Sequence, residues 1–397
     1  MIKIVSSNII SGLGFTSDEN YGNVKLGITG LRFYADGYGL PEPLMASKID
    51  EARLDEAFSA LTPAASGDDR LPAKYTKFEK AAIVSISEAL KSTAVDPADS
   101  RVIIIISTTK GNVFLLDENE REGYEDEQLY LWRSAEIIAY FFGNPNQPLV
   151  VSNACISGAS ALIAASRELS ARHCDYAIVT GADMLSKFAI AGFQSFKALS
   201  PELCKPFDAN RRGLNLGEAA ATMILAEHHI CDIDFEDIML TNSAMHNDAN
   251  HISAPSRTGE GSLLCLKKVM GSYKPGQIAF VNAHGTATSY NDEMESVALS
   301  RAGLRKAPVN SLKGYFGHTL GAAGILESII SISALKEGIV LGTHGFDTLG
   351  VTKRIRIVKE NEPTGKRHFI KMLSGFGGTN AALLFTQLKT PEFHDTH

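Results

Sequence analysis

The chain has 397 residues, of which 44% are hydrophobic and 21% charged, a composition typical of folded globular proteins rather than disordered or fibrous ones. Its 38 basic and 45 acidic residues give a net charge of −7, which disfavours a general binder of nucleic-acid backbones. The apolar runs, such as residues 102–106, are far shorter than the roughly 20 residues of a membrane helix. At this length we expect two domains or two fused halves.

The five cysteines indicate a reducing compartment. They are odd in number and widely spaced, and no two form a Cys-x-x-Cys pair, so a disulfide framework or structural zinc site is disfavoured. Residues 1–14 contain a single lysine and soon reach Ser, Asn and Gly, which predicts a strand and a turn rather than a signal peptide. We therefore expect a cytoplasmic protein that neither inserts into a membrane nor binds nucleic acid.

Strand-like and helix-like segments alternate along the chain, which is typical of an α/β fold whose sheet is covered by helices. The expected elements, in chain order, are a helix at 77–92, strands at 102–107 and 148–152, a helix at 158–171, and a strand at 176–180 that Gly181 ends. Two further segments, residues 41–74 and 112–130, contain mixed charges and prolines or many acidic and polar residues. They predict excursions over the surface.

A weak internal repeat relates the two halves of the sequence. Residues 213–225 can be laid on residues 375–385 so that the first Gly, an Ala pair six residues later and the following apolar strand coincide. Upstream of each lie a strand, a turn of small residues and a Gly/Ala-rich helix. We expect two related α/β halves, residues 1–230 and 231–397, although chance similarity between two Gly/Ala-rich segments is the alternative.

Cys155 differs from the other cysteines in its setting. It follows a buried strand and precedes a helix of small residues in the sequence Ser-Asn-Ala-Cys-Ile-Ser-Gly. A sharp strand-to-helix turn exposes a nucleophile near backbone N–H groups, and the helix N-terminus favours its thiolate form. The alternative for any single cysteine is an inert, buried small residue, and we assign that role to the other four.

Two histidines lie in glycine-bracketed turns that follow predicted strands, His284 in Asn-Ala-His-Gly-Thr and His318 in Gly-His-Thr-Leu-Gly-Ala-Ala-Gly. Such turns direct side chains at ligands, so the pair could move protons or bind developing charge for Cys155. Metal ligation is the rival interpretation, but the sequence has neither an HExxH motif nor a Cys/His cluster. The turn at Gly375–Asn380 is a fourth candidate, whose N–H groups could form half of an oxyanion hole.

Taken together, these motifs resemble the β-ketoacyl-acyl carrier protein synthases, the elongating Cys-His-His condensing enzymes of the thiolase superfamily. Cys155 falls on the family's nucleophile, His284 on the His of its HGT motif and His318 on the His of its GHxxGAAG motif. The remaining matches, in family order, are residues 11–15, 27–30, 206–208 and 217–218, the acidic pair Asp292 and Glu295, Lys313, Glu327 and residues 375–380. The resemblance spans nearly the whole chain.

The resemblance implies a thiolase-like fold of duplicated α/β halves in five layers, α-β-α-β-α. It implies a decarboxylative Claisen condensation of malonyl-acyl carrier protein with an acyl chain on Cys155, in fatty-acid or polyketide synthesis, including the aryl-polyene type. The expected roles are catalysis by Cys155, His284 and His318, and an oxyanion hole from the N–H groups of Cys155 and Phe376. Lys313 and Glu327 would support His318 or form a merely structural ion pair, and Thr286, Thr288, His251 and Phe376 would contact the substrate. No metal or other cofactor is implied, because phosphopantetheine on the carrier protein holds the substrates.

The sequence departs from the family pattern at two positions. Arg212 stands where the central motif commonly has Asp, and Ala219 replaces a Gly; both are expected in a structural turn away from the catalytic groups. The chain could work as a homodimer, or only as a heterodimer with a chain-length factor that lacks the cysteine. A thiolase-like acyltransferase without decarboxylation and a non-catalytic scaffold are further alternatives. Lys205, Arg211 and Arg212 are candidates for docking an acidic carrier protein.

Overall fold

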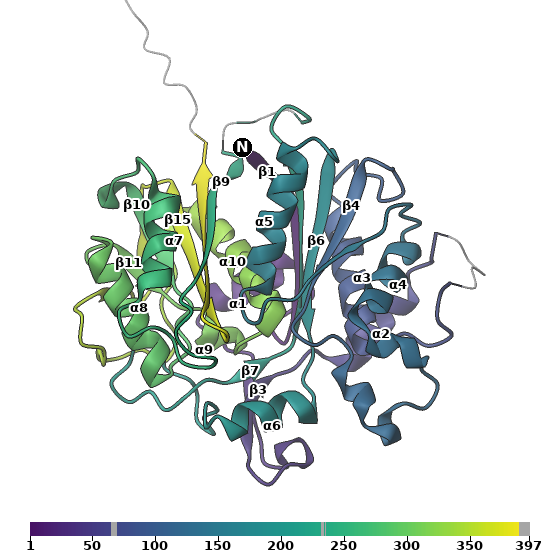
Figure 1. Ribbon diagram of the computed structural model, residues 1–397, viewed down its shortest axis with the longest axis horizontal. Coiled ribbons are helices and arrows are strands. Elements are labelled where there is room, and N and C mark those ends of the chain that lie inside the picture. The colour runs from purple at the N-terminus through teal and green to yellow at the C-terminus, as the bar shows by residue number, and fades with distance from the viewer. Residues whose placement is uncertain (65–69, 232–233, 235, 389–397) are drawn as a thin grey trace, which may run out of the picture.

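The computed structural model describes residues 1–64, 70–231, 234 and 236–388, and its sheet repeats one arrangement of five strands twice (Figure 1). In the N-terminal half the order is β5-β4-β6-β8-β1, and in the C-terminal half it is β11-β10-β15-β16-β9, with the short β13 outside β11. In each half the first three strands are parallel to one another, and the fourth is antiparallel to both of its neighbours. The halves join where Ile2 and Lys3 of β1 pair with Leu240 and Met239 of β9.

These strands have the following bounds. The N-terminal half contains β1 (Ile2–Ser11), β4 (Val102–Ser107), β5 (Leu149–Val151), β6 (Tyr176–Asp183) and β8 (Ala219–Glu227). The C-terminal half contains β9 (Ile238–Asn247), β10 (Ile278–Asn282), β11 (Pro308–Asn310), β13 (Arg356–Ile357), β15 (His368–Gly375) and β16 (Thr379–Gln387). The segments that the sequence repeat aligns are β8 and β16, which occupy equivalent places in the two halves. The predicted boundary at residue 230 falls in the connection between β8 and β9.

Helices form the other three layers of a five-layer α-β-α-β-α stack. The outer face of the N-terminal sheet is covered by α3 (Lys77–Leu90) and α4 (Leu131–Phe141), and that of the C-terminal sheet by α7 (Glu260–Met270) with α8 (Ser289–Arg301) beside it. Between the sheets lie α5 (Ser157–Ser170) and α10 (Ala323–Glu337) (Figure 1). Since α10 is enclosed on every side, nearly all its residues are buried.

Small residues let the two central helices touch. A Cβ added at Gly324 would lie 2.5 Å from the backbone nitrogen of Ala159, and one at Gly158 would lie 2.8 Å from the carbonyl oxygen of Gly321. No side chain fits into such contacts, so the Gly/Ala-rich sequences of both helices set how closely the halves approach.

The remaining elements border this stack. They are α1 (Ser17–Lys25), β2 (Leu31–Tyr34), β3 (Leu44–Ser47), α2 (Glu51–Ser59), α6 (Lys187–Ser195), β7 (Leu216–Gly217), α9 (Lys313–Phe316), β12 (Ile339–Val340) and β14 (Glu362–Pro363); the described residues also form six short 3₁₀ helices. Within the described ranges, no helix is both long and apolar enough to cross a membrane.

The predicted helices and strands correspond to α3, β4, β5, α5 and β6, but Gly181 does not end its strand. β6 continues to Asp183, and Gly181 is needed there because a Cβ would meet the Ser107 hydroxyl at 2.6 Å and the Gly321 carbonyl at 2.8 Å. The two predicted surface excursions are also partly wrong. Residues 41–74 contain β3 and α2, whose Leu44 and Leu54 are buried.

The other excursion, residues 112–130, is anchored by buried polar groups. The side chains of Asn112 and Gln128 both donate hydrogen bonds to the Glu79 carboxylate, which is itself fully buried. Polar composition predicted exposure here, but these amide N–H groups are buried and donate to a buried carboxylate.

Candidate active site

Cys155 lies in a strained turn between β5 and α5. The preceding residue, Ala154, adopts a left-handed backbone conformation with φ of 44°, which is uncommon for a residue with a Cβ. The turn is closed by Ser157, whose hydroxyl accepts from the Asn153 N–H at 2.8 Å and donates to the Ala154 carbonyl at 2.6 Å. The cysteine side chain therefore projects just before the N-terminus of the central helix α5, as the sequence predicted.

The His284 turn follows β10 and is held by two carboxylates of α8. Both oxygens of Glu295 accept backbone hydrogen bonds, one from the His284 N–H and one from the Gly285 N–H, each at 2.7 Å. Asp292 accepts from the Thr286 N–H at 3.0 Å. The acidic pair thus fixes the backbone around the histidine rather than facing the thiol.

The His318 turn, between α9 and α10, fixes the position of a proton. The N–H of Leu320 donates to Nδ1 of His318 at 3.2 Å, so Nδ1 is an acceptor and a neutral imidazole must carry its hydrogen on Nε2. Nε2 itself is buried and has no protein partner in the described part of the chain. His318 therefore offers an unused N–H donor.

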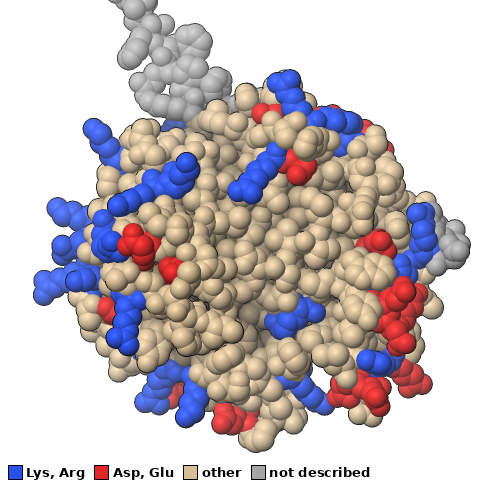
Figure 2. Space-filling model, viewed as in Figure 1, with Lys and Arg blue, Asp and Glu red and all other residues tan. Residues whose placement is uncertain are grey.

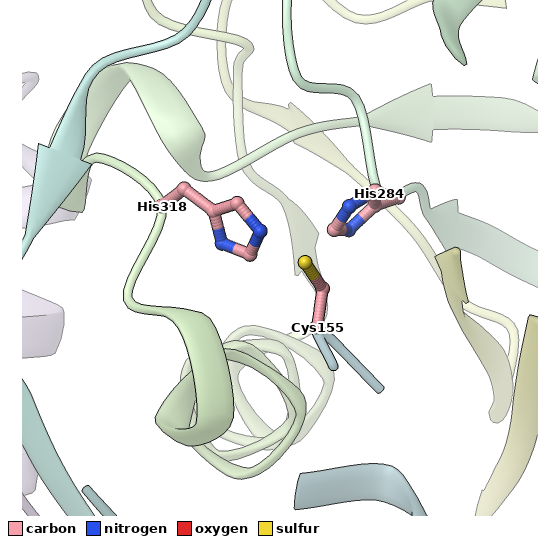
Figure 3. A group of neighbouring side chains, drawn as sticks. All are labelled: Cys155, His284 and His318. Carbon is pink, nitrogen blue, oxygen red and sulfur yellow. The ribbon is translucent and has the colours of Figure 1, made fainter. Parts of the chain in front are cut away.

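The three side chains meet although they come from three separate turns (Figure 3). The Cys155 sulfur and a donor atom of each histidine all lie within 4.8 Å of one another. The imidazole rings are 5.1 Å apart and almost perpendicular, at 83°. Such a group could also hold a metal ion. The buried Lys313 and Lys371, whose positive charges act on both rings, disfavour the binding of a further cation here.

Burial sets the protonation states in the site. It lowers the pKa of both His284 and His318 well below the usual value, and the Lys313 charge adds to the effect, so both rings are neutral at neutral pH. Burial also raises the pKa of the Cys155 thiol to about 11, although Lys110, Lys313 and the Phe376 backbone N–H oppose the shift. The electrostatic preference for a thiolate that the sequence predicted is therefore outweighed by desolvation in the free protein.

The predicted ion pair has a third member that the sequence interpretation missed. Lys313 and Glu327 are in contact and buried, and the second Glu327 oxygen contacts Lys371 of β15. Lys371 is fully buried and also donates to the Asn282 side chain at 2.7 Å and the Ala283 carbonyl at 3.1 Å. The available signal was a lysine inside an otherwise apolar strand sequence, His-Phe-Ile-Lys-Met-Leu.

A cavity of about 350 Å³ leads to the thiol. Cys155, His284, His318, Thr286, Thr288 and Phe376 all line it, together with the cations Lys197 and Arg212. The Phe376 ring packs against Phe193 and Phe196, at 5.8 and 5.3 Å between ring centres. A larger hollow of about 480 Å³ lies against Lys77 and Glu218, but we assign the site to the smaller cavity because the three reacting side chains open into it.

Three sequence-based placements need correction. His251 lies outside the cavity, where its Nδ1 accepts from the N–H groups of Ser253 and Ala254 and shapes a loop that does line it. Arg211 is not a free surface cation, because it lies 3.9 Å from the buried Asp292 and donates to two backbone carbonyls. Arg212 lines the cavity rather than a remote turn, whereas Ala219 is buried at the start of β8.

Family profiles cover most of the chain. The profile of the beta-ketoacyl synthase N-terminal domain matches residues 2–229, and that of the C-terminal domain matches residues 238–347. The chain belongs to the beta-ketoacyl synthase family. This confirms the resemblance on which the sequence interpretation rested.

Curated relatives and solved structures agree. The putative mitochondrial 3-oxoacyl-[acyl-carrier-protein] synthase of Schizosaccharomyces pombe is 26% identical over 97% of this chain and 98% of its own length. The 3-oxoacyl-[acyl-carrier-protein] synthase 2 of Vibrio cholerae is 32% identical over 60% of this chain and 62% of its own. A ketosynthase solved in complex with its chain length factor, from Xenorhabdus doucetiae, is 25% identical with a TM-score of 0.85, covering 97% of this chain and 98% of that one. The thiolase-like α/β fold of a condensing acyltransferase is thereby confirmed.

Proposed function

We propose that this chain condenses an acyl group held on Cys155 with a malonyl thioester, releasing carbon dioxide, and that both substrates arrive on an acyl carrier protein. The observation that carries the proposal is the pair of neutral imidazoles beside the thiol, one of them with a buried Nε2–H that has no partner among the residues the structure describes. A neutral N–H donor can stabilise an enolate oxygen without first losing or gaining a proton.

The first half-reaction loads the cysteine. The Cys155 sulfur attacks the carbonyl carbon of the acyl thioester, the bond from that carbon to the carrier's sulfur breaks, and the acyl group remains on Cys155. Because the thiol is protonated, its proton must pass to the departing sulfur, and a neutral imidazole nitrogen at this distance can accept and return it. The backbone N–H of Phe376, which acts on the thiol, is placed to bind the developing oxyanion.

The second half-reaction forms the carbon–carbon bond. Carbon dioxide leaves the malonyl group, and the electron pair of the broken bond becomes an enolate whose oxygen accepts from the histidine N–H groups. The enolate carbon attacks the acyl carbon on Cys155, and the sulfur leaves as a thiolate that takes a proton from water. The product is a 3-ketoacyl thioester on the carrier, as made in fatty-acid or polyketide synthesis.

Charge around the cavity suits a phosphorylated, acidic carrier. The wall carries Lys197 and Arg212, while Thr286 and Thr288, whose hydroxyls are 2.8 Å apart, lie deeper and can bind an amide-containing arm. Basic side chains also gather over the C-terminal half of the face shown in Figure 2, whereas acidic ones gather on the side of α2. A net-acidic protein can in this way still present a basic docking surface.

A dimer is proposed from the free edge of the N-terminal sheet. β5 is the last strand on that side within the described residues, and its Leu149 is exposed. The exposed rings of Tyr130 and Trp132 stack on each other nearby, at the start of α4, the helix that packs on β5. Apolar groups beside an unpaired strand edge favour association, either with a second copy or with a homologous chain-length factor.

Location and cofactor use follow from the same proposal. We propose that the enzyme works in the cytoplasm, in the same compartment as its carrier protein. Two relatives, from Schizosaccharomyces pombe and Arabidopsis thaliana, are named as mitochondrial. The chemistry described above uses the chain's own side chains and a thioester, so we propose that no metal or other cofactor takes part.

The test follows both half-reactions in the purified protein. With acyl and malonyl carrier proteins, intact-protein mass spectrometry should show an acyl adduct on Cys155, and labelled malonyl should release carbon dioxide. Cys155→Ala should abolish the acyl adduct and the 3-ketoacyl product that depends on it, while Cys174→Ala, at another buried cysteine, should retain them. An acyl adduct without carbon dioxide release would instead favour a simple acyltransferase. Activity that appears only when a homologous, cysteine-less subunit is added would favour the heterodimer.

A further inference from the structure

Lys371 is a buried cation with no role in the reaction described so far. Its ammonium group is enclosed by three oxygens, one each from the Glu327 carboxylate, the Asn282 side chain and the Ala283 backbone. A lysine is almost never fully buried unless its charge is paired, because removing it from water costs several kcal/mol. A neutral side chain would serve packing in β15 equally well, so the charge calls for an explanation.

The contacts place Lys371 on the peptide unit that carries His284. That unit consists of the Ala283 carbonyl and the His284 N–H. The carbonyl accepts from Lys371, and the N–H donates to Glu295 at 2.7 Å. One peptide plane is therefore held at both ends, by a lysine ammonium on its carbonyl and a carboxyl group on its N–H, which fixes the direction in which the imidazole leaves the backbone.

The same cation is connected to the other histidine. Glu327 lies between Lys371 and Lys313, and Lys313 precedes His318 by five residues in the α9 segment. One carboxylate thus binds two ammonium groups, and the cluster has a net positive charge when both lysines are protonated. That charge acts on both imidazoles and favours their neutral forms.

We propose that Lys371 is a positioning residue for the decarboxylation step, which orients the Ala283–His284 peptide and joins the supports of the two histidines through Glu327. The inference rests on the condensing activity proposed above. It concerns mainly the second half-reaction, because the enolate oxygen needs both histidine N–H groups in place, whereas loading needs one imidazole nitrogen as a proton carrier.

A pH dependence accompanies this geometry. The groups that face Lys371 are Glu327 of α10, Lys313 of α9, and Glu295 of α8 beyond the His284 peptide. Burial lowers the pKa of Lys371 to about 8, against the opposing pull of Glu327. Above that pH the ammonium loses its proton, and the Ala283 carbonyl loses a charged donor, so the condensation rate should fall as pH rises.

The test compares Lys371→Met with wild type and with Lys359→Met, a control at an exposed lysine paired with Asp347. In Lys371→Met we expect kcat for condensation to fall about tenfold or more, as a small misplacement of a catalytic group can cause. Loading of Cys155 should fall less than condensation does, because loading uses one imidazole nitrogen as a proton carrier whereas condensation needs both histidine N–H groups aimed at one oxygen. The KM for the malonyl carrier should stay the same, and the alkaline fall near pH 8 should disappear. The control should match wild type in every respect.

Two results would overturn the proposal. One is a folded Lys371→Met with wild-type kcat and pH profile, and the other is an equal loss of loading and condensation. If this variant does not fold, the wild-type profile decides, since a condensation rate that stays flat from pH 7 to pH 9.5 contradicts the proposal. Failure of the condensing function itself would be distinguishable, because wild type would then release no carbon dioxide.

Discussion

The two halves of this protein share one strand order but place different side chains at equivalent positions. At one position of the repeat, the N-terminal half has Gly181, which pairs with Ser107 and Ala221, and the C-terminal half has Lys371, which pairs with Asn282 and Leu383. Around Gly181 the backbone of residues 321–322 packs so closely that no side chain fits. At the equivalent position of the C-terminal half, Lys371 belongs to a buried ion cluster.

This difference teaches how a duplicated fold acquires an asymmetric site. The N-terminal half contributes a strained turn and a nucleophile, whereas the C-terminal half contributes two imidazoles and the charges that orient them. Identical strand topology therefore does not specify which half binds the proton and which attacks the substrate. The side chains at the strand ends decide it.

The largest expected effect is that of His318→Ala, which separates the role of the C-terminal imidazoles from that of the N-terminal nucleophile turn. His318→Ala should lower carbon dioxide release by about 10² to 10³, the usual loss when one donor to a developing oxyanion is removed. Loading of Cys155 should fall much less, because the N-terminal turn and its backbone donors are unchanged. Intact-mass and carbon dioxide assays measure the two steps, with the exposed His173→Ala as control. A loss shared equally by both steps would contradict this division.

The tight packing at Gly181 can be tested by adding one methyl group. Gly181→Ala should lower the free energy of unfolding by about 1–3 kcal/mol, because the new Cβ meets the backbone of Gly321 and Ala322 rather than a flexible side chain. Gly192→Ala in α6 is the matched control, since a Cβ there meets nothing within 4 Å and alanine favours a helix. Denaturant unfolding measures the stability of both variants. Equal stability would show that the backbone near residues 321 and 322 moves aside at no cost.

The neutral histidines predict how stability depends on pH. Both have pKa values below the usual 6.5 in the folded chain, so below that pH the unfolded chain binds protons that the folded site does not. The contribution of each neutral histidine to stability is complete above about pH 6.5 and should fall by up to about 1.4 kcal/mol per pH unit as pH decreases. The raised pKa of Glu295 acts in the opposite direction over part of this range. Urea titrations between pH 5 and pH 8 test this, and His318→Gln should show a shallower slope. The same slope in the variant would assign the effect to other groups.

The smallest effect concerns strain in the nucleophile turn. Ala154→Gly removes the Cβ from a left-handed residue and should raise unfolding stability by no more than about 1 kcal/mol, since glycine also gains entropy when unfolded. Thermal unfolding measures the gain. Ala171→Gly, at an ordinary helix-end conformation, should give no such gain. A clear loss of stability in Ala154→Gly would show that the turn is not strained.

Local sequence patterns predicted much of this arrangement because they depend on neighbouring residues. The strand at 102–107, the helix of α3, the turn of Cys155 and the glycine-bracketed turns of both histidines were all visible in short segments. The bringing together of Cys155, His284 and His318 was implied by family resemblance, and the structure supplies its geometry.

What could not be predicted depends on contacts between distant segments. Lys371 meets Glu327 across 44 residues of sequence, and Gly181 is constrained by a loop 140 residues away, so neither is recognisable from its neighbours. The pKa of Cys155 likewise depends on distant segments. The favourable helix end is local, but the burial that outweighs it is produced by both halves together.

The close contact between α5 and α10 makes catalysis the most fragile property of the molecule. The sulfur and the imidazoles belong to opposite sides of that contact, so a separation of the halves by the width of one water molecule disperses them while each sheet remains intact. Activity should therefore disappear early during heating, before the secondary structure melts. The loss should reverse on cooling if the glycine-mediated contact between α5 and α10 forms again.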